Sequence, residues 1–442
     1  MYGEKTLIHA FTLRGKNYVL DVESGTILMP DPLSFKVLLA LEKGEDVNLL
    51  SIEKEILDSI LAEIKELKKA GMLFTPAPNI EEKREYGLKA LCLNMAHDCN
   101  LRCTYCFGDK GAFGGERKKM SVDIAKRALL MLAQKSGKRK NLEVDFFGGE
   151  PLINFEAVKE AVVYGRQLEK EYDKNFRFTI TTNAYSFPEE YMDFLNKEMK
   201  NVVISVDGRK QTHDRLRKTV SGGGSYDKVI ENAMKFVKKR GEGEHYIRGT
   251  FTSNNLDFSA DVTDLVDKGF KQISIEPVVT VGSLAITKEM LPQIMDEYEK
   301  LFDLLREYKD TEKWFNFFHF MIDLDAGPCL NKRIRGCGAG REYVAISPDG
   351  DIYPCHQFVG KSEFLMGNIF YGIIDKDIAK KFSSVNVFEK EDCSKCFAKY
   401  YCSGGCAANS YNITGDLKKN VDISCEMERK RVELSIALAL DK

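Results

Sequence analysis

The chain has 442 residues, enough for two or three domains, and its 43% hydrophobic and 30% charged residues are typical of a globular protein. The formal net charge of −2, without a dense basic run, gives no electrostatic reason to expect a nucleic-acid partner. No apolar window is long enough to span a membrane and no signal sequence opens the chain, so we expect a cytoplasmic protein with no membrane partner. In a reducing cytoplasm, twelve cysteines favour metal ligation over disulfides.

Residues 1–75 predict a small, winged-helix-like module in which a hairpin accompanies amphipathic helices. Gly15 to Asn17 form the expected turn of the hairpin. Residues 76–87, with two prolines and a charge run, are the expected linker. The predicted strands cover 7–14, 18–22 and 26–29, and the predicted helices cover 32–41 and 52–70.

Residues 88–280 alternate between strand-like apolar runs and helical stretches, a pattern typical of a parallel α/β domain. In such a domain, polar groups that follow the strands meet at one edge of the sheet, where ligands bind. A helical bridging region is expected over 281–328, and its aromatic run at 314–322 favours a buried core stripe over the apolar wall of an active site. The predicted strands cover 88–95, 142–147, 177–181, 202–206, 246–251 and 272–275, and the predicted helices include 122–135, 155–172 and 226–239.

Three cysteines, Cys99, Cys103 and Cys106, follow the first of these strands at C-x3-C-x2-C spacing. A closed zinc site needs four protein ligands, whereas an iron-sulfur cluster bound by three cysteines keeps one iron open. The segment, including Tyr105, resembles the fingerprint of the radical S-adenosylmethionine (SAM) superfamily. This resemblance implies an incomplete (β/α)6 barrel and a [4Fe–4S] cluster whose open iron binds SAM and cleaves it to a 5′-deoxyadenosyl radical. A zinc loop or three unrelated buried thiols are the alternatives, and Cys92, inside the strand, is expected to be a core residue.

Further candidate SAM contacts lie at later strand ends. Gly148, Gly149 and Glu150 follow the second strand and resemble the motif that binds the methionyl amine of SAM, with Glu150 as the acceptor. For each single polar residue at the other strand ends, the alternative to a SAM contact is a turn cap or a surface ion pair. The resemblance implies further contacts from Tyr105, Phe107, Asn183, Ser205 and Arg217.

A second cysteine group, within residues 329–442, matches the pattern of the seven-cysteine SPASM domain. The resemblance implies two auxiliary [4Fe–4S] clusters, which would bring the total to three. Cys329 is a candidate fourth ligand of cluster I, and without it an open iron would be free for a substrate thiolate. A pair of structural zinc sites is the competing interpretation. The implied ligands are Cys337, Cys355 and Cys406 for auxiliary cluster I, and Cys393, Cys396, Cys402 and Cys425 for auxiliary cluster II.

The order of the three parts most resembles the maturases of peptides with six cysteines in forty-five residues, and more broadly the sactipeptide synthases. This resemblance implies an enzyme that recognises a leader peptide through residues 1–75 and installs thioether crosslinks in a cysteine-rich precursor peptide. It also implies an electron donor such as ferredoxin or flavodoxin. His356 stands where sulfatase maturases carry an aspartate, which argues against that activity, and it is either a proton acceptor or a buried structural histidine.

Three other functions stay open at this point. The nearest is a different radical SAM peptide modification, namely carbon-carbon crosslinking or epimerisation. A non-enzymatic iron-sulfur electron carrier would leave Gly149 and Glu150 without a role. A zinc-bearing winged-helix regulator would contain zinc in place of iron.

Overall fold

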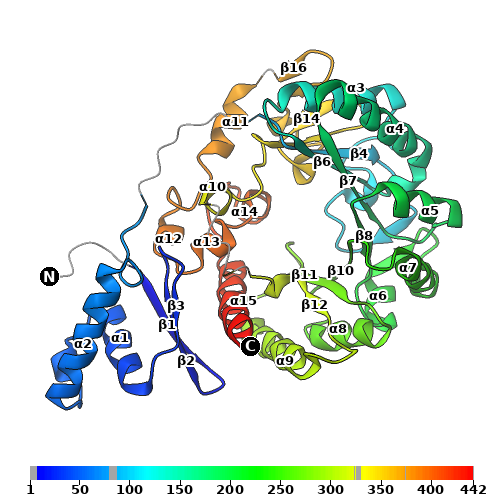
Figure 1. Cartoon of the computed structure of the whole chain (residues 1–442). Helices are drawn as coiled ribbons and strands as arrows, with labels where there is room; N and C mark the ends of the chain where they lie inside the picture. The colour runs from blue at the N-terminus through cyan, green and yellow to red at the C-terminus, as the bar shows by residue number, and fades with distance from the viewer. Residues whose placement is uncertain (1–6, 79–86, 323, 325–329, 374, 442) are drawn as a thin grey trace.

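The structure, a computed structural model, describes residues 7–78, 87–322, 324, 330–373 and 375–441. A small N-terminal sheet with two helices lies beside an arc of strands whose outer side is covered by helices, and the C-terminal helices lie between the two (Figure 1). Cys329 and most of the predicted linker lie outside the described residues. Within the described residues, every helix falls short of the length and apolar character needed to cross a membrane.

The N-terminal module contains the predicted hairpin and both helices. The hairpin turns at Arg14 and Gly15, whose φ angles of 48° and 75° give the mirror-image turn that suits the twist of paired strands. Lys16 and Asn17 therefore belong to the second strand and not to the predicted turn. The elements are β1 (Ile8–Leu13), β2 (Lys16–Asp21), β3 (Ile27–Leu28), α1 (Pro32–Lys43), η1 (Val47–Leu49) and α2 (Lys54–Lys69).

Both faces of this small sheet are buried. Side chains alternate between the faces of a strand, and along β2 Val19 joins the core formed with α1 and α2. Its neighbours Tyr18 and Leu20 join the main core of the chain instead. The module is therefore packed against the rest of the protein through a shared apolar face.

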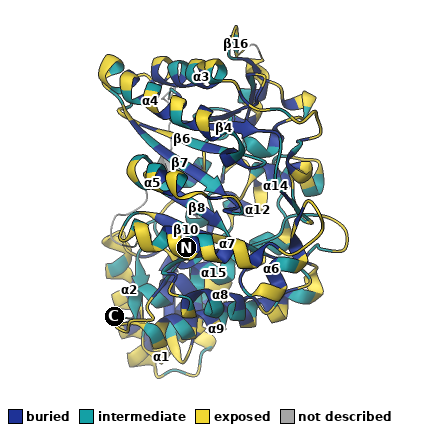
Figure 2. Cartoon of the chain, turned by 90° about the vertical axis from the view of Figure 1, so that its right-hand side faces the viewer, coloured by how far each residue is buried: buried dark blue, intermediate teal, exposed yellow. Residues whose placement is uncertain are grey.

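The six predicted strands of the barrel are all present, parallel and in chain order. They are largely buried, while the helices outside them expose one face (Figure 2). The predicted partial (β/α)6 barrel is confirmed. Its strands are β4 (Ala90–Ala96), β6 (Asn141–Gly148), β7 (Asn175–Thr182), β8 (Asn201–Ser205), β10 (His245–Phe251) and β11 (Gln272–Pro277), and its helices are α3 (Val122–Lys135), α4 (Phe155–Tyr172), α5 (Glu189–Glu198), α6 (Lys210–Leu216), α7 (Tyr226–Arg240) and α8 (Phe258–Asp267).

Short elements join the strands to the helices at the strand ends. A two-stranded antiparallel ribbon and two 3-10 turns lie among the candidate site residues. They are β5 (Leu101–Cys103), β9 (Arg217–Thr219), η2 (Asp109–Gly111) and η3 (Pro151–Asn154).

The barrel sheet continues into the C-terminal region at one end and into the bridging region at the other. β13 (Tyr343–Ile346) pairs in parallel with β4, and β12 (Asn316–Phe317) pairs in parallel with β11. The result is one eleven-stranded sheet that carries the SPASM-like segment on its edge. The other elements are η4 (Lys288–Met290), α9 (Leu291–Tyr308), η5 (Phe318–Phe320), α10 (Leu330–Arg335), β14 (Asp351–Tyr353), η6 (His356–Phe358), η7 (Ser362–Phe364), β15 (Gly367–Asn368), β16 (Gly372–Ile373), α11 (Lys376–Ser383), α12 (Glu391–Ser394), α13 (Lys399–Cys402), α14 (Ala407–Thr414) and α15 (Asp422–Leu440).

The aromatic run of the bridging region contains both buried and half-exposed side chains. Phe315, Phe317 and Phe320 are buried in the main core, as the core-stripe interpretation predicts. Trp314 and Phe318 are about half exposed. The run lines a cavity of about 630 Å³ between α9 and α15, and none of the candidate site residues takes part in that lining.

His9 of β1 links the module to the C-terminal helix in a way that depends on pH. Its Nε2 lies 2.9 Å from Glu433 and its Nδ1 lies 3.5 Å from Glu42. Burial lowers the pKa of His9, but the two carboxylates more than offset this, so the pKa is raised above 6.5. The protonated ring therefore stabilises the docked module below a pH of about 6.5, and this contribution, up to about 1 kcal/mol, is lost as the pH rises through the folded-state pKa.

We expect hydrogen exchange in β1 and β2, corrected for intrinsic rates, to show easier opening above neutral pH than at a pH of about 6. His9→Gln should remove this difference, because glutamine has no charge to lose. Equal protection of the wild-type hairpin at both pH values would contradict the assignment.

Candidate cofactor site and cysteine groups

The loop that carries Cys99, Cys103 and Cys106 leaves the end of β4 and folds over the mouth of the barrel. Its β5 segment pairs with β9, which sets Cys103 opposite Arg217. Burial raises the pKa of Cys99 to about 12 and that of Cys103 to about 11, and the charge of each neighbouring thiol adds to the shift. The three thiols thus share one buried site, where a bound cation is needed to favour the thiolates.

The Gly148–Glu150 segment is in direct contact with that cysteine loop. Gly149 N donates to Ala96 O at 2.8 Å, and Glu150 N donates to Asp98 O at 2.9 Å. A Cβ added at Gly149 would lie 2.1 Å from Asp98 O, and one at Gly148 would lie 2.5 Å from Ala96 O. The glycines therefore let the second strand end approach the backbone of the cysteine loop.

Glu150 is buried and its carboxylate is already oriented by the chain. It accepts hydrogen bonds from Thr182 Oγ1 at 2.8 Å, Asn183 N at 2.7 Å and Leu152 N at 3.1 Å. Burial raises the pKa of Glu150, and these bonds oppose the shift. A carboxylate accepts about four hydrogen bonds, so one acceptor position is left for a ligand.

Asn183 connects the end of β7 to the same loop. Its side-chain nitrogen donates to Asn100 Oδ1 at 2.8 Å and lies 3.6 Å from the sulfur of Cys99. Two predicted site residues are thus joined directly to the cysteine loop and to each other.

Arg217 forms a buried cluster with Tyr105 and Asp207. The Tyr105 hydroxyl donates to Asp207 Oδ2 at 2.8 Å, and Arg217 Nη1 donates to the Tyr105 oxygen at 2.8 Å. Among the described residues, the buried Nε of Arg217 has no partner, which leaves a charged donor for an anionic group such as a carboxylate. The aromatic Tyr105 is therefore tied into the site by its hydroxyl.

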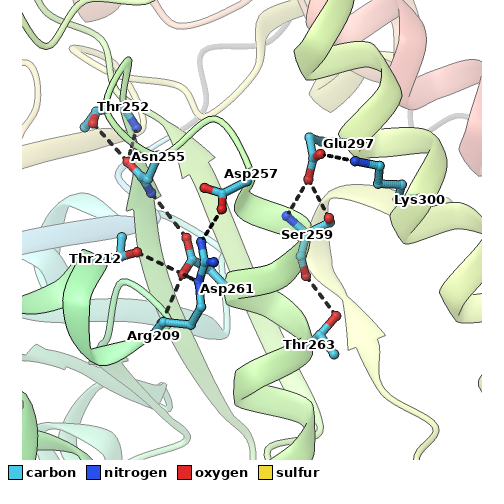
Figure 3. Close-up of polar contacts among 10 residues, drawn as sticks. All are labelled: Arg209, Thr212, Thr252, Asn255, Asp257, Ser259, Asp261, Thr263, Glu297 and Lys300. Carbon is cyan, nitrogen blue, oxygen red and sulfur yellow. Dashed lines mark hydrogen bonds and ion pairs between the residues drawn. The ribbon is translucent and has the colours of Figure 1, made fainter.

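The loop after β8, which follows Ser205, is fixed by a network that the sequence did not indicate (Figure 3). The carboxylate of buried Asp261, on α8, accepts from Arg209 N at 3.0 Å, Arg209 Nε at 2.7 Å and Thr212 Oγ1 at 3.0 Å. A Cβ at Gly208 would lie 2.2 Å from the Asp261 side chain. Asp261 thereby sets the position of the loop between Ser205 and Arg217. In the sequence, the only indication of this role is a single acidic residue on the apolar face of the helix.

Seven of the remaining candidate cysteines separate into two groups in space. Burial raises the pKa of Cys355 to about 12, and Cys406 and Cys337 contribute to the shift. Burial likewise raises the pKa of Cys402 to about 12, with contributions from Cys425 and Cys393. Cys393 and Cys396 both raise the pKa of Cys425 in turn. The thiols of Cys337, Cys355 and Cys406 thus lie near one another, and those of Cys393, Cys396, Cys402 and Cys425 form a second neighbourhood.

Within the ranges that the structure describes, no three His, Cys, Asp or Glu side chains are arranged to bind one metal ion. Thiolates are soft ligands of the kind that iron-sulfur clusters use, so the three cysteine groups fit such clusters by their ligand chemistry.

The ion pair of Arg248 on β10 and Glu276 on β11 lies near both the first cysteine loop and Cys406. Arg248 Nη2 lies 2.6 Å from Glu276 Oε2. Glu276 is near enough to contribute to the raised pKa of Cys406, and Tyr105 and Asp207 contribute to that of Arg248. The charge of Arg248 within the barrel strand is therefore paired with Glu276.

His356, which follows Cys355, packs against Phe107, which follows Cys106. Their rings lie 5.5 Å apart, and the hydroxyl of Tyr343 lies 3.2 Å from His356 Nδ1. Burial lowers the pKa of His356 to about 4. The imidazole is therefore neutral near pH 7 and retains one nitrogen able to accept a proton.

Arg217→Lys tests the buried donor cluster. Lysine keeps the charge but loses the planar fork, so we expect SAM binding to weaken by about tenfold or more while the fold is retained. Equilibrium binding of SAM to the reconstituted protein measures this, with exposed Arg215→Lys as the control. Equal SAM affinity in the two variants would contradict a ligand contact at Arg217.

Two family models match the chain. Residues 93–254 match the radical SAM superfamily, and residues 337–397 match SPASM, an iron-sulfur cluster-binding domain. The first range contains all the candidate SAM contacts, and the second contains four of the auxiliary cysteines.

Several known proteins are similar over most of their length. A cysteine-type anaerobic sulfatase-maturating enzyme of Clostridium novyi is 25% identical over 79% of this chain and 96% of its own. The mycofactocin maturase of Mycolicibacterium smegmatis is 24% identical over 81% of this chain and 90% of its own. The solved structure of native anSMEcpe with bound AdoMet and Cp18Cys peptide has a TM-score of 0.63 and 20% identity, over 79% of this chain and 97% of that one.

The family matches agree with the barrel, the buried cysteine loop and the two further cysteine groups. The radical SAM and SPASM domains indicate SAM and [4Fe–4S] clusters as the cofactors. The chain accordingly combines a radical SAM barrel with a C-terminal SPASM domain, and it is similar over most of its length to several maturases.

Proposed function

We propose that this protein is a peptide maturase that installs thioether crosslinks, from cysteine sulfur to carbon, in a ribosomally made, cysteine-rich precursor peptide. The observation that carries the proposal is the Arg248–Glu276 ion pair, which lies near both Tyr105 of the first cysteine loop and Cys406. A peptide bound beside this pair would have one reactive centre on each side. The similarity to a sulfatase-maturating enzyme and to a mycofactocin maturase supports a peptide substrate. The similar structure of anSMEcpe with a bound Cp18Cys peptide supports it as well.

In the proposed site, Cys99, Cys103 and Cys106 ligate the radical SAM cluster, which when bound supplies the electron for reductive cleavage of SAM. Glu150 accepts the amine of SAM at its remaining acceptor position, and the free donor of Arg217 binds the carboxylate. The other proposed contacts to SAM come from Tyr105, Phe107, Gly148, Gly149, Asn183 and Ser205.

The SPASM segment binds two auxiliary clusters in this proposal. Cys337, Cys355 and Cys406 ligate cluster I, with Cys329 or a substrate thiolate on its fourth iron. Cys393, Cys396, Cys402 and Cys425 ligate cluster II. Thioether formation removes one hydrogen from the acceptor carbon and one from the thiol, so one electron and one proton must leave after the hydrogen is abstracted. The auxiliary cysteines provide the electron route toward an acceptor protein. His356 relays the proton to solvent and does not retain it, because burial lowers the pKa of its ring to about 4.

The N-terminal module binds the leader peptide in this account. β3 is an edge strand of its sheet, so an extended leader segment can add beside it through main-chain hydrogen bonds. Leader binding would raise the local concentration of the core peptide at the barrel. A ferredoxin or flavodoxin is the proposed electron donor.

The test is anaerobic incubation with SAM, dithionite and a synthetic cysteine-rich precursor encoded beside the gene, followed by mass spectrometry. A thioether lowers the peptide mass by two hydrogens per crosslink and removes one alkylatable thiol each time. A carbon-carbon crosslink lowers the mass without consuming a thiol, and epimerisation leaves the mass unchanged. Either of those results would replace the thioether proposal with the corresponding alternative, and SAM cleavage that never alters a peptide would contradict peptide maturation.

A further inference from the structure

A buried ion pair joins the N-terminal module to the segment between Cys396 and Cys402. Glu23, just after β2, is 8% exposed as a residue, and its side chain is 2% exposed. Its carboxylate lies 2.5 Å from Lys399 Nζ and accepts a hydrogen bond from the Tyr400 hydroxyl at 2.6 Å. A carboxylate from one end of the chain is therefore buried against two consecutive residues of the other end.

The ammonium of Lys399 contacts more than one ligand segment. It also donates to Ser394 O at 3.3 Å, and Ser394 lies between Cys393 and Cys396. Lys399 is the first residue of α13, and Cys402 is its last. One ammonium, oriented by Glu23, thus connects the segments that carry three of the four proposed ligands of auxiliary cluster II.

A second contact reinforces the same junction. The ring of His9 stacks on Phe397 with centroids 3.5 Å apart and planes 4° apart. Phe397 directly follows Cys396. His9 also contacts Glu433 on α15, the helix whose first turn carries Cys425. The module therefore contacts the segments that bear Cys396, Cys402 and Cys425 directly, and it reaches the segment of Cys393 through Lys399.

A buried ion pair is a poor source of stability, because desolvation of both charges offsets most of their attraction. The ion pair does favour one arrangement of its two segments, however, because either charge would be costly to bury without its partner. We propose that Glu23 is a positioning residue for auxiliary cluster II, which orients the ligand segments through Lys399 and Tyr400. This inference rests on the proposed ligand set of that cluster.

Two properties of the cluster follow from this role. The ligand segments lose their shared anchor without the Glu23 carboxylate, so the cluster assembles less completely. The carboxylate is also a fixed negative charge near the cluster, and net charge is one determinant of cluster potential. Removal of a nearby negative charge makes reduction easier, so the midpoint potential of the remaining cluster should become more positive.

The experiment uses the full chain, reconstituted anaerobically, with Glu23→Gln, Glu23→Asp and a matched control. The control is Glu391→Gln, because Glu391 pairs with Lys395 in the same cysteine segment, but at the surface. Iron and sulfide per chain, the auxiliary EPR signals and their midpoint potentials are measured. Cys393→Ala identifies the contribution of cluster II, and SAM cleavage without peptide reports whether the barrel is folded.

We expect Glu23→Gln to lose iron toward the level of Cys393→Ala, and its residual cluster II signal to move to a more positive potential. Glu23→Asp and Glu391→Gln should resemble the wild type, and all variants should cleave SAM. If Glu23→Gln is insoluble, Glu23→Gln combined with Lys399→Met removes the unpaired charge. This double variant should still lose iron, because the shared anchor is absent, but its cluster potential should shift less than that of Glu23→Gln because both charges are gone.

Unchanged iron and potential in Glu23→Gln, beside a clear iron loss in Cys393→Ala, would overturn the positioning role and leave the proposed function intact. Unchanged iron in Cys393→Ala would instead refute the proposed ligand set of auxiliary cluster II. The positioning role of Glu23, which rests on that ligand set, would fall with it.

Discussion

Cys103→Ala is expected to abolish reductive SAM cleavage, with 5′-deoxyadenosine falling to the level of a no-enzyme control. Cys103 lies opposite Arg217 and shares its site with Cys99 and Cys106, so its loss leaves too few thiolates for the cluster. Chromatography of the nucleoside products measures the effect. Cys92→Ala is the control, because Cys92 is a buried core cysteine whose truncation costs about 1 kcal/mol or more of stability without removing a ligand.

The auxiliary cysteines should respond differently. Cys393→Ala is expected to cleave SAM at a rate near that of the wild type while it fails to crosslink the peptide, because the barrel site is complete without it. SAM cleavage that persists in Cys103→Ala, or that disappears in Cys393→Ala, would contradict the division of labour between the two regions.

Gly149→Ala should be nearly as severe as loss of a cysteine, although it removes no functional group. The new Cβ would lie 2.1 Å from Asp98 O and 3.1 Å from the Cα of Gly111, and both neighbours are backbone. The cysteine loop and the Glu150 segment must therefore move apart. A displacement of about 1 Å in a preorganised site costs about a hundredfold in rate, and we expect at least that loss in SAM cleavage.

The matched control for this variant is Gly223→Ala. Gly223 lies in an exposed loop, and a Cβ there would lie 3.5 Å from its nearest neighbour, an ordinary contact. Its SAM cleavage should remain within about twofold of the wild type. A Gly149→Ala protein as active as Gly223→Ala would show that the close approach has no consequence for the site.

The sequence allowed the barrel and the cysteine groups to be predicted because both leave a local signal. The apolar run that becomes β4 and the helical spacing of apolar residues over α3 can each be recognised within a short segment of sequence. The cysteine spacing likewise marked two groups along the chain, and only the family resemblance divided the second group into two ligand sets. The thiols within each of the three resulting sets lie near one another in the structure.

Features that depend on distant contacts were beyond sequence reasoning. β13 and β12 are short strands that extend the barrel sheet at both ends, and two to four residues carry no periodicity. The buried partners Glu23 and Lys399 are separated by most of the chain, and each alone looks like a surface charge. The same holds for Asp261, whose role depends on Arg209 and Gly208.

The position of the hairpin turn also differs slightly from the position that the sequence predicted. Gly15 was expected to open the turn, but Arg14 also adopts a left-handed conformation, with φ of 48°, so the turn is earlier by one residue. A non-glycine residue rarely adopts this conformation, and local sequence favoured Lys16 and Asn17 instead.

The central claim is that SAM-dependent radical chemistry acts on a carbon of a bound peptide. The most direct measurement is the mass of 5′-deoxyadenosine formed with a precursor peptide deuterated at its carbon positions. We expect the 5′-deoxyadenosine to contain deuterium. For each crosslink the peptide should lose one deuterium from carbon, one hydrogen from sulfur and one free thiol. A modified peptide accompanied by 5′-deoxyadenosine without deuterium would contradict the account.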